Sequence, residues 1–436
     1  MTSELERTDV VIVGAGFTGL SAALELKAAG IDFILFEAQD RVGGRVESRQ
    51  NGLGERIDSG GQFICDDMPE VMALARLRGK TLVRAYAEGD FVAQPPMSAS
   101  EGARTYGASM AIRERMNAIA PDDPAIAGLS VAAWLARQDD PEAAKAAFSA
   151  MIEGLWCQAL ERLPLWHLID NDRRITNEVT ELQYLLAETM HSLADDLASD
   201  LGRRIRLGSA VARVEQGSDG LRVVTDSGLI AATSVLVAVP PVMASKIAVS
   251  PPLPAPLSKA LDVWRSGMVI KIQLRYASAF WRDRGQSGIV IWREPSSLFA
   301  CDVSKDTSHP ALAFFIGGSL AKSWGDLDEA TLRTEVTSRL VAALGDEAGA
   351  IIDFSFRIWT DDRWSGGGYA DLILDMAATD AERVLVAGAP PIHFASSELS
   401  PSFPGYVEGA IIAGRIAARK IISEIQSAIA TSASGS

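Results

Sequence analysis

The stretch DVVIVGAGFTGLSAALELKAAGIDFILFE, residues 9–37, decides the fold class of this chain. DVVIV is a short run of mostly β-branched residues, which is typical of a buried parallel strand. The helical pattern SAALELKAAG follows and ends at Gly30, and FILFE then has the pattern of a second strand. Two parallel strands joined by a helix form a right-handed βαβ unit. The sequence therefore predicts an α/β protein that begins with this unit.

The turn between the first strand and the helix contains Gly14, Gly16 and Gly19, and Glu37 closes the second strand. Gly14 allows a tight turn, Gly16 lets a pyrophosphate approach the backbone, and Gly19 lets the helix pack closely on the strand. The helix N-terminus offers unpaired N–H groups to phosphates, and Glu37 can accept hydrogen bonds from a ribose. The motif predicts a dinucleotide site but does not distinguish NAD from FAD.

Composition narrows the class of protein further. The chain has 436 residues, too many for one ordinary core, so we expect two domains. With 56 acidic and 41 basic side chains the net charge is −15, which argues against binding to a nucleic-acid backbone. The three cysteines and four histidines are scattered, so we expect neither a disulfide framework nor a metal site. A polar N-terminus and the lack of a long apolar run predict a cytoplasmic protein with no membrane span.

The rest of the chain divides into a helical part and a part rich in strands. Residues 68–205 carry apolar residues at helical spacing, and strand-like runs follow. One of these runs is GMVIKIQLRY, residues 267–276, in which alternation places Lys271 on the face opposite Ile270 and Ile272. A lysine there is expected either on a solvated strand face or at a functional site.

A second glycine-rich segment, FEAQDRVGGRVES, continues from Glu37. Gly43 and Gly44 free the backbone to meet a second phosphate, and Arg45 supplies a cation that Arg41 can assist. The segment resembles the extended FAD fingerprint of the flavin amine oxidase family. One βα turn is enough for nicotinamide enzymes, so this second turn favours FAD.

The segment IDSGGQF follows and also matches that family. The resemblance implies that Gly60, Gly61 and Gln62 lie against the isoalloxazine ring. Related amino acid oxidases place a carboxylate-binding arginine at the position of Gln62, so the glutamine argues against a free amino acid as the substrate.

The resemblance continues through residues 10–420, with the matching segments in the same order. It implies that the backbone at Val211 meets the adenine and that Lys271 holds a water near flavin N5. It also implies that Tyr369 and Tyr406 form an aromatic cage over the flavin, between which an amine would lie. We therefore expect Lys271, Tyr369 and Tyr406 to be the catalytic residues.

Other positions in these segments complete the expected FAD site. Trp359 and Trp364 match residues that line or support the cage wall, and Glu398 matches an acid near the ribitol. Some members bind FAD through a cysteine where this chain has Gly368, so FAD should be non-covalent here. The segment around Tyr406 resembles most closely that of the bacterial 6-hydroxynicotine oxidases involved in nicotine degradation.

The predicted fold is an α/β protein with an FAD-binding Rossmann-like domain and a substrate domain that combines a mixed sheet with helices. Residues 1–75, 203–245 and 370–425 are expected in the FAD domain, 76–202 and 246–369 in the substrate domain, and 426–436 in a disordered tail. The expected reaction passes hydride from the α-carbon of a small secondary or cyclic amine to flavin N5. O₂ then takes up the electrons and gives H₂O₂. The resemblance also implies that a homodimer is possible.

Three alternatives remain open from sequence. A flavin desaturase or oxidase acting on C–C bonds would share the fold without the lysine and the tyrosine cage. A non-catalytic binder related to the GDP-dissociation inhibitors of small GTPases would share the fold without a flavin. A nicotinamide dehydrogenase would need only the first glycine turn.

Overall fold

The glycine-rich N-terminal stretch forms the predicted βαβ unit in the computed structural model, which describes residues 5–176, 178–218 and 220–434. Strand β1 (Arg7–Val13) leads into helix α1 (Phe17–Ala28), and β2 (Phe33–Phe36) pairs with β1 in parallel. Val10, Val11 and Ile12 are fully buried because helices and other strands cover both faces of this pair.

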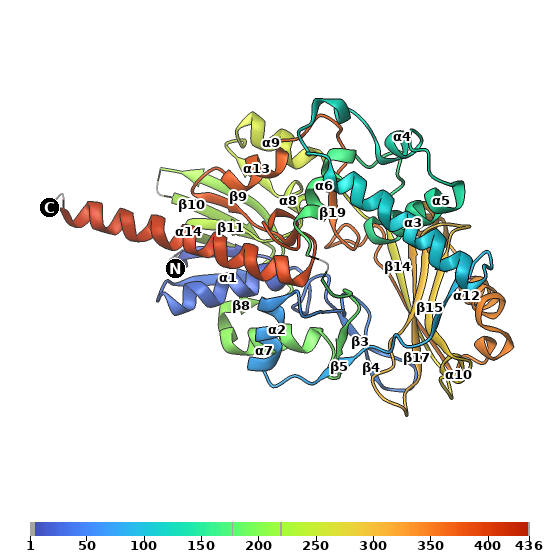
Figure 1. The fold of residues 1–436 in the computed structure, drawn as a ribbon. Helices are drawn as coiled ribbons and strands as arrows, with labels where there is room; N and C mark the ends of the chain where they lie inside the picture. The colour runs from blue at the N-terminus through green and yellow to red at the C-terminus, as the bar shows by residue number, and fades with distance from the viewer. Residues whose placement is uncertain (1–4, 177, 219, 435–436) are drawn as a thin grey trace.

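The βαβ unit belongs to an eight-stranded mixed sheet in the order β12-β9-β10-β11-β1-β2-β8, with β20 paired to β11. β11 runs parallel to β1, whereas β9, β10 and β11 form an antiparallel meander. In Figure 1, α1 and the long C-terminal helix α14 lie side by side along this sheet. The added strands are β8 (Ile205–Arg206), β9 (Val211–Gly217), β10 (Gly220–Thr225), β11 (Gly228–Val237), β12 (Ala248–Ser250) and β20 (Ile392–Phe394).

A second sheet of six strands, in the order β18-β14-β17-β16-β15-β6, forms the other half of the molecule (Figure 1). Strand β14 lies between β18 and β17. Ile270, Ile272 and Leu274 on one face are fully buried in a core shared with α12. The strands are β6 (Asp90–Gln94), β14 (Val269–Arg275), β15 (Gln286–Trp292), β16 (Leu298–Asp302), β17 (Ala311–Gly317) and β18 (Asp353–Ile358).

Helices and short strand pairs complete the fold, and the predicted helical character of residues 68–205 is confirmed by α2 to α7. The remaining helices are α2 (Pro69–Leu77), α3 (Ala99–Ala118), α4 (Val131–Leu135), α5 (Glu142–Trp156), α6 (Leu165–Arg173), α7 (His191–Leu201), α8 (Pro241–Ala244), α9 (Ala255–Asp262), α10 (Phe280–Asp283), α11 (Gly318–Gly325), α12 (Glu329–Leu344), α13 (Ala381–Ala387) and α14 (Val407–Ser434). The two-stranded pairs are β3 (Ser48–Gln50) with β4 (Arg56–Asp58), β5 (Leu82–Arg84) with β7 (Tyr184–Leu186), and β13 (Trp264–Ser266) with β19 (Asp371–Ile373). No helix in the described part of the chain is both long enough and apolar enough to cross a membrane.

The C-terminal segment differs from the disordered tail expected over 426–436. Helix α14 continues through Ser434. Hydroxyl groups in this last part donate to carbonyls four residues earlier, as Ser427 does to Ser423, and the alanines between them favour helix. Residues 435–436 of the expected tail lie outside the described residues. The division into two domains stays a prediction, although β12 joins the eight-stranded sheet from within the expected substrate segment.

Candidate active site

The first glycine turn leaves open space at one glycine and fills the space at the other two. A Cβ atom on Gly14 would lie 2.8 Å from the carbonyl oxygen of Ala238, and one on Gly19 would lie 1.9 Å from that of Gly14. A Cβ atom on Gly16 would have no heavy atom within 4 Å. Packing within the protein therefore explains Gly14 and Gly19. Gly16 instead borders a space that a ligand can enter.

The second glycine turn lies directly beside the first. The amide of Gly43 donates to the carbonyl of Ala15 at 2.8 Å, and a Cβ atom on Gly44 would lie 3.4 Å from the Cα of Gly16. Gly43 and Gly44 both have positive φ angles, 97° and 61°, which favour glycine. Two backbone turns and the N-terminus of α1 therefore converge on one place, as a pyrophosphate site requires.

Glu37 lies at the end of β2, next to the first turn. Its Oε2 accepts from the amide of Ala15 at 2.8 Å, and its Oε1 accepts from the amide of Gln39 at 2.9 Å. Burial raises the pKa of this carboxyl, and these two backbone N–H groups partly offset the effect. The amide of Ser209 donates to the Glu37 carbonyl, so the segment leading to Val211 passes the same spot. The adenosine contacts expected for Glu37 and the Val211 backbone stay predictions.

Arg41 is held by the protein itself. Its Nη1 donates to the carbonyls of Val42 and Gly44 at 3.1 and 3.0 Å, and its Nη2 lies 2.7 Å from the Glu47 carboxylate. Arg41 therefore braces the second glycine turn, and the phosphate contact expected for it stays a prediction.

Arg45 links the second turn to the C-terminal segments. Its Nη1 pairs with Glu398 Oε1 at 2.5 Å and donates to the carbonyl of Tyr369 at 3.0 Å. Burial alone would raise the pKa of Glu398, but Arg45 outweighs it and lowers the pKa to about 2. The same carboxylate accepts from the amide of Asp371 at 3.0 Å. This ion pair positions the backbone at Tyr369 relative to Gly44.

The Gly60–Gly61 turn packs against the same arginine. The amide of Gly61 donates to the Arg45 carbonyl at 3.2 Å, and a Cβ atom on Gly60 would lie only 2.3 Å from that carbonyl oxygen. Gln62, the next residue, is buried, and its Nε2 has no hydrogen-bond partner among the described residues. An unsatisfied buried donor next to a glycine turn fits a site that is completed by a bound group.

Lys271 lies on β14, and its side chain points toward the Gly60 turn. Only 4% of the residue is exposed. Its Nζ donates to the carbonyl of Gly60 at 2.7 Å and to Oε1 of Gln62. Burial lowers the pKa of Lys271 to about 7, although the carboxylate of Asp58 acts in the opposite direction. The solvated strand face that remained open from sequence is therefore wrong.

The two tyrosines come from distant segments that meet. A Cβ atom on Gly405 would lie 2.9 Å from the Cβ of Ala370, so the residues adjacent to Tyr369 and Tyr406 are in contact. Tyr369 is 40% exposed although its backbone is held from inside by Arg45. Such exposure of a large ring leaves a face free for a planar partner.

Further aromatic and acidic side chains surround the tyrosines, and the sequence did not single them out. Phe315 on β17 lies 6.1 Å from the ring of Tyr369 and 5.7 Å from Lys271 Nζ, measured to ring centroids. The hydroxyl of Tyr406 donates to Oε2 of Glu181 at 2.5 Å. Alternation along β17 places Phe315 on one face, but pairing with β14, which the sequence does not specify, brings it beside Lys271.

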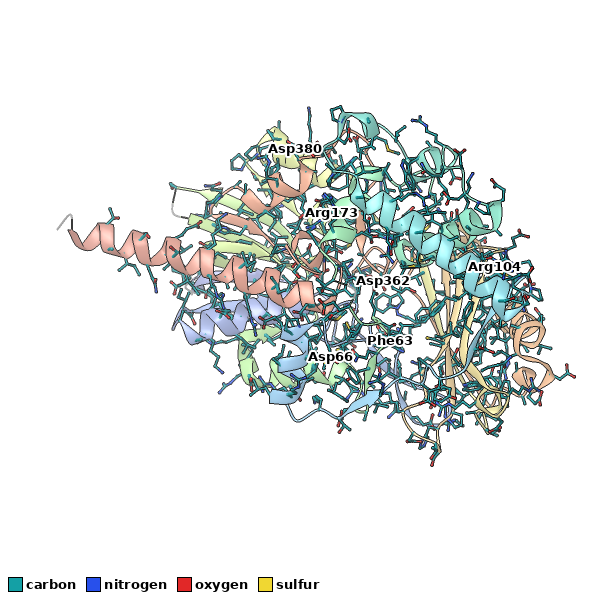
Figure 2. The ribbon with its side chains drawn as sticks, viewed as in Figure 1. Phe63, Asp66, Arg104, Arg173, Asp362 and Asp380 are labelled. Carbon is teal, nitrogen blue, oxygen red and sulfur yellow. The ribbon has the colours of Figure 1, made fainter. Side chains whose placement is uncertain are left out.

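An apolar cluster adjoins these residues on the face of the second sheet. Its buried members Cys301, Ala313 and Phe315 come from β16 and β17, and Phe63, Leu182 and Phe299 pack against them from its edge. In Figure 2, Phe63 lies in the middle of the molecule, between the two large sheets. This cluster forms an apolar wall beside Lys271.

The two tryptophans expected at the cage wall are held in different ways. Trp359 is 4% exposed, packs with Cys157 and Val269, and donates from Nε1 to the carbonyl of Ser59 at 2.9 Å. Cys157 is fully buried at the end of α5 and belongs to this same small cluster. Trp364 is partly buried, and Arg363 stacks on its ring at 4.6 Å. Flavin contacts for Trp359 and Trp364 stay predictions.

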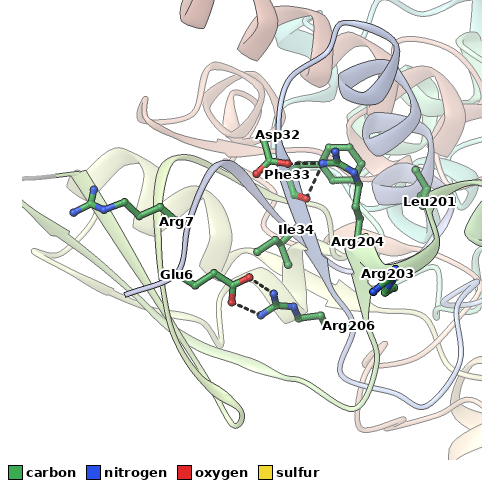
Figure 3. Close-up of a pocket in the computed structure, with 9 residues that line it drawn as sticks. All are labelled: Glu6, Arg7, Asp32, Phe33, Ile34, Leu201, Arg203, Arg204 and Arg206. Atoms are coloured by element: carbon green, nitrogen blue, oxygen red, sulfur yellow. Dashed lines mark hydrogen bonds and ion pairs between the residues drawn. The ribbon is translucent and has the colours of Figure 1, made fainter. Parts of the chain in front are cut away.

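A second hollow lies beside the first strand. It has a volume of about 470 Å³ and, as Figure 3 shows, is lined by Arg7 from β1 and by Arg203, Arg204 and Arg206 from the segment that ends in β8. The first glycine turn follows the other end of β1. The carbonyl of Arg206 nevertheless accepts from the Glu37 amide at 2.9 Å, so the lining of this pocket is joined to the end of β2.

Comparisons with known proteins agree with this geometry. Residues 17–422 match the family model described as flavin containing amine oxidoreductase. The chain is 26% identical to the L-amino acid dehydrogenase of Synechocystis sp., over 95% of this chain and 94% of that protein. It is 28% identical to the putrescine oxidase of Kocuria rosea, over 95% of each. The solved structure of cyclohexylamine oxidase from Brevibacterium oxydans covers 96% of this chain with a TM-score of 0.88 at 24% identity, and 99% of that chain is covered, which shows a shared fold.

Proposed function

The chain belongs to the family of flavin-containing amine oxidoreductases, and from this premise we propose that it oxidises the C–N bond of a small amine at the Lys271–Tyr369–Tyr406 site. The cofactor is FAD, held non-covalently, because Gly368 stands where a covalent link would need a cysteine. When bound, FAD accepts two electrons and a hydrogen from the substrate and passes the electrons on. Because the family contains flavin, the alternative of a nicotinamide dehydrogenase is excluded.

The residues present fit this cofactor. The open space at Gly16 suits the pyrophosphate, and the buried carboxylate of Glu37 suits a ribose. The partnerless Nε2 of Gln62 and the turn at Gly60 suit the ring system. These observations support the FAD contacts expected from sequence, and each contact is part of the proposal.

Binding of the amine is the task of the aromatic residues. The rings of Tyr369 and Tyr406 would hold the amine between two flat faces, and aromatic faces attract the partial positive charge that develops on the carbon next to nitrogen. The apolar wall with Phe315 limits access of water and disfavours the protonated amine. Hydride transfer requires the neutral amine and no strong base. The aromatic rings therefore do the positioning, and no carboxylate is needed at the reacting carbon.

For the substrate we propose a secondary or cyclic amine such as 6-hydroxynicotine or a related alkaloid. The support is the C-terminal segment IHFASSELSPSFPGY and the apolar character of the wall formed by Phe63, Phe299 and Phe315. The names of the relatives point instead to putrescine and cyclohexylamine as substrates of those proteins, so primary amines form the competing group. We propose O₂ as the acceptor, giving H₂O₂. The cytoplasmic location and the homodimer stay predictions.

An amino acid substrate is the second candidate, because one relative is an L-amino acid dehydrogenase. Such a substrate needs a cation for its carboxylate. Two arginines near the tyrosines already form ion pairs within the protein. Arg45 pairs with Glu398. Arg113 donates to both carboxylate oxygens of Asp172, at 2.7 and 2.8 Å. Together with Gln62 at the position of the expected arginine, this pairing favours an amine without a carboxylate.

The observation that carries the proposal is the convergence of Lys271, Gly60 and Tyr369 beside two adjacent glycine turns. The test is oxygen uptake by the purified holoenzyme with a panel of 6-hydroxynicotine, nicotine, putrescine, cyclohexylamine, benzylamine and L-amino acids. We expect turnover with at least one amine and little with the amino acids. Turnover with amino acids alone, or with none of the panel, would reject the proposal.

A further inference from the structure

A crevice reaches Lys271 from the side away from the aromatic residues. It has a volume of about 210 Å³, and its lining includes Lys271 itself with Ser59, Gln273, Ser355 and Arg357. Nothing in the proposed binding of amine or FAD uses this space.

The register of the second sheet shows why the crevice and the apolar wall lie on opposite sides of Lys271. On β17, Phe315 pairs with Lys271, and on β18, Arg357 pairs with the same lysine from the other edge of β14. Directly paired residues point to the same face of a sheet. Lys271 therefore stands on one face between an aromatic neighbour and an arginine neighbour. The apolar cluster extends over β17 and β16, and the crevice extends over β18.

The crevice is polar, and its arginines are paired with carboxylates. Arg49 pairs with the buried carboxylate of Glu47 at 2.5 Å, and Arg357 pairs with Asp362 at 2.5 Å and with Glu47 at 3.3 Å. Glu329 also lines the crevice. Such a polar space suits water, protons carried by water and small polar oxygen species, whereas an apolar amine gains little from it.

We propose that this crevice is the aqueous route of the oxidative half-reaction, through which a proton reaches the cofactor by way of Lys271 and H₂O₂ leaves. The inference rests on the proposed function with O₂ as the acceptor. Reduction of one O₂ to H₂O₂ takes two electrons and two protons. Both electrons and one proton would come from the reduced cofactor when it is bound, and Lys271 would pass on the second proton from water in the crevice. The amine and its product use the side with Tyr369 and Phe315, so the two half-reactions have separate openings.

Chemical labelling of Lys271 in the FAD-bound holoenzyme tests the route without turnover. Cyanate is a small anion that carbamylates unprotonated lysines, and its product on the Lys271 peptide is quantified by mass spectrometry. Ser355→Trp places a bulky ring in the crevice, and we expect carbamylation of Lys271 to slow by about tenfold. The matched control Ser323→Trp, at an exposed position on α11, should leave the rate unchanged. Leu182→Trp, which fills the apolar side, should also leave it unchanged.

A second variant keeps the test decisive if Ser355→Trp folds poorly, as judged by flavin content and melting temperature. Gln273→Ala shortens a lining side chain on the same face of β14 as Lys271 and should accelerate carbamylation of Lys271. If Leu182→Trp protects Lys271 while Ser355→Trp and Gln273→Ala do not change its rate, the lysine is reached from the amine side and the inference is overturned.

The functional half of the inference uses photoreduced holoenzyme, so it needs no amine. Mixing with O₂ should reoxidise the Ser355→Trp flavin about tenfold more slowly than wild type, while binding of FAD is unaffected. Reoxidation at the wild-type rate would overturn the role of the crevice. If the proposed amine oxidation is wrong, no amine will reduce the flavin. The labelling of Lys271 and the reoxidation of the photoreduced flavin can still be measured in that case, so the two failures are distinguishable.

Discussion

Replacing Lys271 by methionine tests how the buried ammonium acts. The side chain lies on β14, is 4% exposed, and donates from Nζ to the Gly60 carbonyl at 2.7 Å. Methionine has a similar length and no charge, so Lys271→Met removes the cation with little change in volume. We expect FAD to remain bound because, in the described part of the chain, the turns at Gly14–Gly19 and Gly43–Gly44 and the carboxylate of Glu37 make no contact with this side chain.

The expected magnitude follows from charge and distance. Negative charge develops on O₂ as it takes the first electron, and two unit charges 4 Å apart at an effective dielectric constant of 20 interact by about 4 kcal/mol. The carboxylate of Asp58 faces Lys271 and offsets part of this interaction energy. We therefore expect Lys271→Met to lower the reoxidation rate by about 100-fold. The reduction of the flavin by amine should change by less than about threefold, because hydride transfer does not build negative charge on oxygen.

The pH dependence gives a second readout of the same variant. Burial lowers the pKa of Lys271 to about 7, with Asp58 and Cys301 acting against burial and Lys305 acting with it. Lys271 is therefore a cation below about pH 7 and neutral above it. The wild-type reoxidation rate should fall as pH rises through 7, whereas reduction by amine should rise with pH because the substrate must lose its proton.

Stopped-flow absorbance separates the two half-reactions. Anaerobic mixing with amine gives the reduction rate, and mixing the reduced enzyme with O₂ gives the reoxidation rate, each measured across the pH range for wild type, Lys271→Met and the surface control Lys322→Met. The control should behave as wild type. Equal reoxidation rates for wild type and Lys271→Met at pH 6, or the same pH profile in both, would refute the role assigned to the lysine.

Four further substitutions test the site and the core. Gly16→Val should abolish FAD binding with little change in the melting temperature of the apoprotein, because a Cβ atom at this position meets only open space. Gly19→Ala should unfold the protein, because its Cβ atom would lie 1.9 Å from a carbonyl oxygen. Retention of flavin by Gly16→Val would contradict the site. Glu398→Gln leaves Arg45 without its carboxylate partner and should lower the free energy of unfolding, measured in urea, by about 3 kcal/mol. A loss below about 1 kcal/mol would show that this ion pair does not stabilise the fold. Ile272→Ala should cost about 2–5 kcal/mol in the same assay without loss of flavin, because the side chain is fully buried on the face of β14 that points away from Lys271.

Much of the fold could be predicted from local patterns. The βαβ unit follows from one apolar run, three glycines and a second apolar run, all within 29 residues of sequence. Alternation along β14 correctly placed Lys271 and Gln273 on one face. The pattern could not tell whether that face is buried, because burial depends on the Gly60 turn, which comes from a segment more than 200 residues away.

The site was predicted least well where side chains meet through tertiary packing. Phe315 and Glu181 carry no motif, and they contact Tyr369 and Tyr406 because strands and loops from different parts of the chain converge. The binding of the Arg41 guanidinium by Glu47 and backbone carbonyls was likewise not visible in the sequence, and its phosphate contact stays a prediction. The tail was expected to be disordered from its small polar residues, whereas hydroxyl-to-carbonyl hydrogen bonds accompany a continuous α14.

Anaerobic titration of the purified protein with an amine from the panel tests the central claim most directly. The account predicts a yellow protein whose visible flavin absorption bleaches with about one equivalent of a small amine per flavin and returns when air is admitted. A protein that carries no flavin after purification and reconstitution with FAD, or a bound flavin that no amine bleaches, would contradict it.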